Sequence, residues 1–131
     1  MAKLIHSMIR VLNLDVSLRF YKDALGLSVS NRLDFSDFVL VYLKNEKSNF
    51  EIELTWNRGR EQAYAHGDGY GHIAVAVDDL EAERERMLKL NIGSTPIKEF
   101  KRGDEMLARF FFVQDPDGYK IEVLERFGHY V

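Results

Sequence analysis

The sequence lacks cysteine altogether, and it also lacks long apolar runs and an excess of basic residues. Without cysteine there is no disulfide, no thiol nucleophile and no cysteine-ligated zinc or iron–sulfur site, so any metal must be bound by His, Asp or Glu. No apolar run approaches the length of a membrane span, and the N-terminus lacks a signal-peptide pattern. The net charge of -3 gives no basic surface for nucleic acid. We therefore expect a cytoplasmic protein that binds neither membranes nor nucleic acids.

The chain has the composition of an ordinary globular protein, with 46% hydrophobic and 30% charged residues. Its 131 residues are enough for one domain, or for two very small modules that share a core.

Two stretches of the sequence read alike, IHSMIRVLNLDVSLRFY and GHIAVAVDDLEAERERM. Each opens with a His, continues as an apolar strand, breaks at Asn or Asp and then follows a helical pattern. Each half also closes on a strand with a central Glu, in FEIELT and in YKIEVLE. The separations from His6 to Glu53 and from His72 to Glu122 are nearly equal. Such self-similarity predicts that one structural unit occurs twice.

Periodicity predicts the elements of each unit. Leu14, Leu18, Tyr21 and Leu25 recur at helical spacing, with Asp15 suited to cap the start of that helix and Gly26 its end. A second, more charged helix is predicted at 80–90, and the sequence Asp-Pro-Asp-Gly at 115–118 suits a type I turn. Strands are predicted at 3–11, 29–35, 38–43, 49–56, 70–77, 95–100, 106–113 and 119–125.

The predicted fold is therefore α+β, one domain made of two βαβββ modules whose mixed sheets curl. The modules are expected at about 1–57 and 70–127, joined by a polar, glycine-containing loop at 58–69.

Strand alternation places one His and one Glu of each half in an otherwise apolar strand. A carboxylate in a core strand is costly without a partner, and a divalent cation removes that cost. Two imidazoles and two carboxylates suit Ni, Co, Zn, Mn or Fe(II). The predicted ligands are His6, Glu53, His72 and Glu122.

Simpler interpretations exist for each of these residues. Glu51 and Glu53 are also typical of the solvated face of an edge strand. Glu122 can pair with Lys120 on an exposed face, and a single His in a strand usually makes only hydrogen bonds. For His66 and His129, in a loop and near the C-terminus, we expect surface positions.

The chain resembles glyoxalase I of the vicinal oxygen chelate superfamily over nearly its whole length. The resemblance is carried by LIHSMIRV, FYKDALGL, IELTWNRG and YGHIAVAVDDL, followed by DPDGYKIEVLE. In that family the positions matching His6, Glu53, His72 and Glu122 bind one divalent metal per site. A His at the first position, in a chain this short, is more similar to the nickel- or cobalt-preferring type than to the longer zinc type, so Ni or Co is expected, with Zn as the alternative.

The resemblance also implies an assembly and a reaction. The family forms homodimers whose two sites lie at the subunit interface, one subunit giving the ligands of its first module and the other those of its second. The substrate is the hemithioacetal of methylglyoxal and glutathione, and the product is S-lactoylglutathione. A carboxylate loosened from the metal serves as the base, with Glu122 as first choice and Glu53 as the other candidate.

Substrate binding is expected at Arg10 and Asn57, which match glutathione-binding positions of the family; without that match, a surface salt bridge is the favoured role for Arg10. Arg58 and Asp68 depart from the family pattern, and the charged segment 98–105, expected as a loop, has no clear counterpart. Two alternatives therefore stay open: an isomerase or epimerase acting on another thiol or thioester, and a drug-binding module of the same fold without catalysis.

Overall fold

The computed structural model describes residues 1–131, which divide into two units, Met1–Ala65 and His66–Val131. None of its helices has both the length and the apolarity to cross a membrane.

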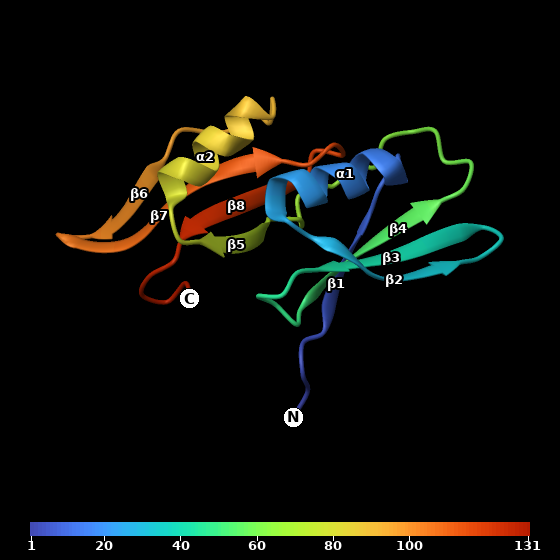
Figure 1. Cartoon of the computed structure of the whole chain (residues 1–131), viewed down its shortest axis with the longest axis horizontal. Helices are drawn as coiled ribbons and strands as arrows, with labels where there is room; N and C mark the ends of the chain where they lie inside the picture. The colour runs from blue at the N-terminus through green and yellow to red at the C-terminus, as the bar shows by residue number, and fades with distance from the viewer. The chain divides into compact units, whose positions relative to one another are not determined.

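The first unit contains one helix and a four-stranded sheet (Figure 1). Along the chain, the elements are β1 (His6–Arg10), α1 (Leu14–Leu25), β2 (Ser28–Asp34), β3 (Phe38–Lys44) and β4 (Glu51–Asn57). The strand order is β1-β4-β3-β2, with β1 parallel to β4 and the other pairs antiparallel. The sheet is therefore mixed, and β4 lies inside it.

The second unit repeats this plan. Its elements are β5 (Ile73–Val77), α2 (Leu80–Lys89), β6 (Lys98–Arg102), β7 (Glu105–Gln114) and β8 (Lys120–Glu125). The strand order is β5-β8-β7-β6, with β5 parallel to β8 and the other pairs antiparallel. In Figure 1, α2 lies along one face of this sheet. The predicted βαβββ architecture is confirmed.

The ends of α1 show one correct and one incorrect prediction. Gly26 ends the helix in the left-handed conformation, with φ of 65°, as its position predicts. The N-cap is Asn13, whose side chain accepts from the amide of Val16, and not Asp15. Both residue types cap well, so the extended backbone of Asn13 decides between them. Asp15 lies in the first turn, where the helix dipole favours a negative charge.

The segment 98–105 is not a loop, and this prediction was wrong. Lys98–Arg102 forms β6, and it pairs with β7 as a hairpin whose turn holds Gly103 at φ of 61°. The predicted strand at 95–100 thus lies a few residues later. Every residue of β6 is exposed, so the strand has no apolar face that a sequence pattern can reveal.

In each unit the buried side chains alternate along the inner strands. In β3 and β4 they include Val39, Val41, Leu43, Ile52 and Leu54. Phe111, Val113, Ile121 and Val123 occupy the equivalent positions of β7 and β8. Burial of a side chain of this size is worth about 1.5–3 kcal/mol. The residues between these buried ones point to the opposite face of the sheet, and the polar groups of the candidate site lie on that face.

Candidate metal centre

The first unit brings His6 and Glu53 into contact. His6 is the first residue of β1, and Glu53 lies in the middle of β4. The parallel register sets Met8 opposite Glu53, which places His6 two residues earlier on the same face. The Nε2 atom of His6 lies 2.8 Å from a carboxylate oxygen of Glu53. The His6 side chain is 35% exposed and that of Glu53 only 10%.

The second unit builds the same pair with His72 and Glu122. His72 directly precedes β5, and Glu122 lies within β8. Ala74 is opposite Glu122, so the His is again two residues before the position that faces the Glu. The Nε2 atom of His72 lies 2.7 Å from a carboxylate oxygen of Glu122. Two units with different sequences therefore arrange an imidazole and a carboxylate in the same way.

The structure disagrees with the simpler interpretations of both carboxylates. β4 is an inner strand and Glu53 is buried, so this Glu does not belong to a solvated edge. β8 is also an inner strand, and the ion-pair partner of Glu122 is His72. Each Glu is thus held facing a His, at a place in the sheet where a carboxylate needs a partner.

An aromatic ring lies beside each pair, and the sequence did not reveal it. Tyr42 of β3 is directly opposite Glu53, and its ring packs edge-on against His6 with the centroids 5.6 Å apart. Phe112 of β7 is directly opposite Glu122, and its ring packs against His72 in the same way at 5.4 Å. The antiparallel register brings these rings to the site, and that register cannot be read from either strand alone.

Tyr42 also shares the strand face of Glu53, because the two residues are directly opposite each other in the register of β3 and β4. Burial of the hydroxyl and the neighbouring negative charge of Glu53 raise the pKa of Tyr42 above its ordinary value. The phenol therefore keeps its proton, which suits it to donate a hydrogen bond.

The donor atoms fit a divalent cation. Two ligands bound at about 2.1 Å from one metal, at angles of roughly 90–110°, lie about 3–3.4 Å apart. The separations of 2.8 and 2.7 Å are close to that value, so small movements would accommodate an ion between the two groups. Imidazole nitrogen with carboxylate oxygen suits Ni, Co, Zn, Mn and Fe(II). Neither unit by itself gathers three or more such side chains.

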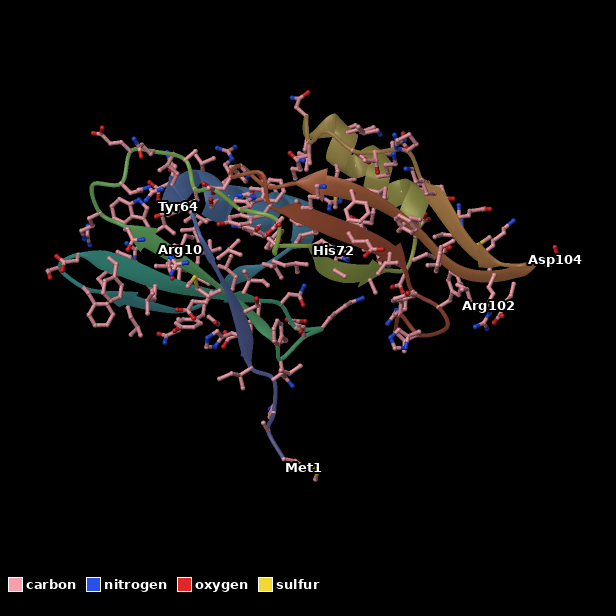
Figure 2. All side chains as sticks on the ribbon, turned by 180° about the vertical axis from the view of Figure 1, so that it is seen from behind. Met1, Arg10, Tyr64, His72, Arg102 and Asp104 are labelled. Carbon is pink, nitrogen blue, oxygen red and sulfur yellow. The ribbon has the colours of Figure 1, made fainter.

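The two predicted substrate-binding residues lie on the site-bearing strands of the first unit. Arg10, labelled in Figure 2, ends β1. Strand alternation places it on the face of His6, four residues earlier. Asn57 ends β4 and donates from its side-chain amide to the hydroxyl of Tyr64 at 3.0 Å. The next residue, Arg58, lies over the ring of Trp56 and donates to the carbonyl of Phe35.

Four charged residues near the turn of the β6–β7 hairpin form two ion pairs with one another. Lys101 contacts Glu99 at 3.3 Å, and Arg102 contacts Glu105 at 3.0 Å near the hairpin turn. In Figure 2, Arg102 and Asp104 mark the far tip of this hairpin.

The remaining histidines behave differently from each other. His129 is exposed, as expected. His66 is partly buried, contrary to the predicted surface position, because its ring stacks on Tyr119 with the centroids 4.1 Å apart.

A family model with the description Glyoxalase/Bleomycin resistance protein/Dioxygenase superfamily matches residues 3–123. The chain belongs to this superfamily. Within the superfamily, the chain is 40% identical to the lactoylglutathione lyase of Haemophilus influenzae, over 94% of this chain and 92% of that protein. It is 39% identical to a probable lactoylglutathione lyase of Synechocystis, over 93% of this chain and 94% of that protein.

Solved structures of two glyoxalase I enzymes have a fold similar to that of this chain. Glyoxalase I from Zea mays matches with a TM-score of 0.84 and 30% identity, covering 96% of this chain and 45% of that one. The trypanothione-dependent glyoxalase I of Leishmania major matches with a TM-score of 0.75 and 36% identity, covering 95% of this chain and 87% of that one.

Proposed function

We propose that this chain is a lactoylglutathione lyase, which isomerises the hemithioacetal of methylglyoxal and glutathione to S-lactoylglutathione. The observation that carries the proposal is the repeated His–Glu pair, placed at the same register in two units. The relatives named lactoylglutathione lyase, matched over almost the whole chain, support it. A binding module without catalysis has no need for two carboxylates held beside imidazoles on inner strands.

Each active site is proposed to combine a His6–Glu53 pair with a His72–Glu122 pair around one divalent metal, Ni or Co by preference and Zn as the alternative. Since neither unit by itself supplies more than two such ligands, a four-ligand site needs one unit of each kind. We propose that the two units come from different subunits of a homodimer, which closes two equivalent sites by two-fold symmetry.

A cation bound there would stabilise the negative charge that develops on the substrate oxygens as the carbon-bound proton leaves. The chain's own task is then proton transfer. Glu122 takes the proton from the carbon that bears sulfur and returns it to the neighbouring carbon, while the hydroxyl proton passes from one substrate oxygen to the other, so the base is regenerated without an external acid. Glu53 remains in place, and His6 and His72 orient the two carboxylates.

Glutathione presents carboxylates and amides, so the chain must supply cations and amide groups. Arg10 and Asn57 provide both types at the ends of β1 and β4. The second unit adds a cavity of about 720 Å³ whose lining includes Thr95, Phe112 and Lys120. Lys120 shares a strand face with Glu122, which suits it to bind a substrate carboxylate.

The experiment that tests the function is metal analysis followed by an assay of the metal-reconstituted protein. Ni²⁺, Co²⁺ and Zn²⁺ are each added to metal-free protein, and isomerisation is followed with methylglyoxal and glutathione. Trypanothione is compared as thiol, because the Leishmania major relative depends on it. Turnover with glutathione supports the proposal, whereas turnover with another thiol alone supports a different isomerase of the superfamily. No metal binding and no turnover would favour a binding module.

Complementation tests the shared site. His6→Ala and His72→Ala variants are each expected to be inactive, because every site loses one ligand. In a heterodimer of the two, one site has lost both histidines and the other has both. After subunit exchange at equal amounts, about a quarter of wild-type activity should return if sites form between subunits. Sites formed within one chain would give no recovery.

A further inference from the structure

The two halves of the proposed site match in their ligands but differ at the residue facing each carboxylate. Glu53 is directly opposite Tyr42, and Glu122 is directly opposite Phe112. Both rings pack edge-on against the neighbouring His at nearly the same distance. The two environments are therefore alike in shape, and the phenol hydroxyl of Tyr42 is the chemical difference between these rings.

Only one of the two carboxylates therefore has a phenol opposite it. Tyr42 is directly opposite Glu53 and its ring contacts His6, the partner of that Glu, whereas the ring of Phe112 offers Glu122 no donor. Glu53 is also the less exposed side chain, at 10% against 16% for Glu122. A hydrogen bond to a metal-binding carboxylate fixes its orientation, and loss of such a bond commonly costs 10–100-fold in metal affinity.

We propose that Tyr42 is a positioning residue that donates to Glu53 and keeps it as a fixed metal ligand, which leaves Glu122 as the carboxylate free to move and carry the proton. This inference rests on the proposed function. Glu53 and Glu122 are equivalent in the repeat, yet they have different roles, and the hydroxyl group of Tyr42 is the cause of that difference.

Removal of the hydroxyl tests the proposal without changing the shape of the ring. The Ni²⁺ dissociation constant of Tyr42→Phe is measured by competition with a chromophoric chelator, and kcat and KM are measured on the nickel-loaded protein. We expect Ni²⁺ to bind roughly 10–100-fold more weakly than to wild type. The matched control is Tyr70→Phe, which removes a phenol that donates to the backbone of Lys120 and should leave Ni²⁺ affinity unchanged. Thermal unfolding of the metal-free proteins confirms that both variants fold.

A double-mutant cycle shows whether Tyr42 acts through Glu53. In a Glu53→Gln background, the same Tyr42→Phe change should alter Ni²⁺ affinity by less than about threefold. The reciprocal variant, Phe112→Tyr, offers Glu122 a donor and should lower kcat without weakening Ni²⁺ binding.

Two results would overturn the proposal: wild-type Ni²⁺ affinity and kinetics in Tyr42→Phe, or an equal loss of affinity with and without Glu53. Failure of the proposed function has a different signature, because wild-type protein would then bind Ni²⁺ no more tightly than His6→Ala. That outcome overturns both ideas.

Discussion

Replacement of Glu122 by Gln removes the proposed base while it keeps the size of the side chain and one oxygen for metal binding. Glu122 lies on an inner strand with its neighbours Ile121 and Val123 buried, so the change is confined to the site-bearing face. In the metal-free protein its ion-pair partner is His72, whose side chain is 42% exposed. A pair so open to solvent contributes about 1 kcal/mol or less, so the fold should survive.

The effect on catalysis should be far larger than the effect on stability. A positioned general base typically accelerates a reaction 10²–10⁴-fold. Each tenfold corresponds to about 1.4 kcal/mol, so the loss of Glu122 is expected to raise the activation free energy by roughly 3–5 kcal/mol. Since a Gln cannot accept the proton, the loss should appear in kcat, with KM changed little.

The assay compares Glu122→Gln with Glu53→Gln after each is loaded with Ni²⁺ to a measured occupancy. With Glu122 as base, the first variant should bind the metal and turn over slowly, whereas the second should show its main defect in metal affinity. Rates near wild type in nickel-loaded Glu122→Gln would refute the assignment. A selective loss of kcat in Glu53→Gln would transfer the role to that carboxylate.

Three further predictions concern metal binding and stability. Addition of Ni²⁺ at about 100 times its dissociation constant should stabilise wild-type protein by roughly 2.7 kcal/mol, and thermal unfolding should show no such gain for His72→Ala. Leu54→Ala empties a fully buried position beside Glu53 and should cost about 2–5 kcal/mol in urea unfolding. The hydrogen bond from Arg109 lowers the pKa of Glu81. Because the folded pKa lies below the unfolded value, any advantage of wild type over Glu81→Gln should be fully present near neutral pH and be lost as the pH falls through the lowered pKa of Glu81.

The repeat made most of the fold predictable. A His, an apolar strand, a helical pattern and a closing strand with a Glu occur twice, so evidence for each element in one half supports its counterpart in the other. Two predictions were wrong, the loop at 98–105 and the N-cap of α1. In the first case the sequence has no local signal for a strand, and in the second it offers two residues that could cap the helix. The strand Lys98–Arg102 has no buried residue, and Asn13 and Asp15 are both good caps two positions apart.

The site was predictable only to the extent that it depends on alternation along single strands. Alternation placed Glu53 and Glu122 on defined faces, and the family resemblance named their partners. The contacts themselves depend on how strands pair. His6 reaches Glu53 because the parallel register sets Met8, and not His6, opposite that Glu. A shift of that register by one residue would turn the His to the other face.

The difference between the two halves also depends on strand pairing, so no single strand of the sequence reveals it. Tyr42 follows the buried Val41 in an alternating strand, and nothing in that pattern marks its ring as a neighbour of a proposed metal ligand. Its role arises from two pairings at once: β3 with β4, which brings it opposite Glu53, and β4 with β1, which brings His6 beside both. A duplicated module gives two matching His–Glu pairs, and the proposed mechanism has one carboxylate move while the other stays. One hydroxyl on a neighbouring strand is sufficient to break that equality without altering the fold.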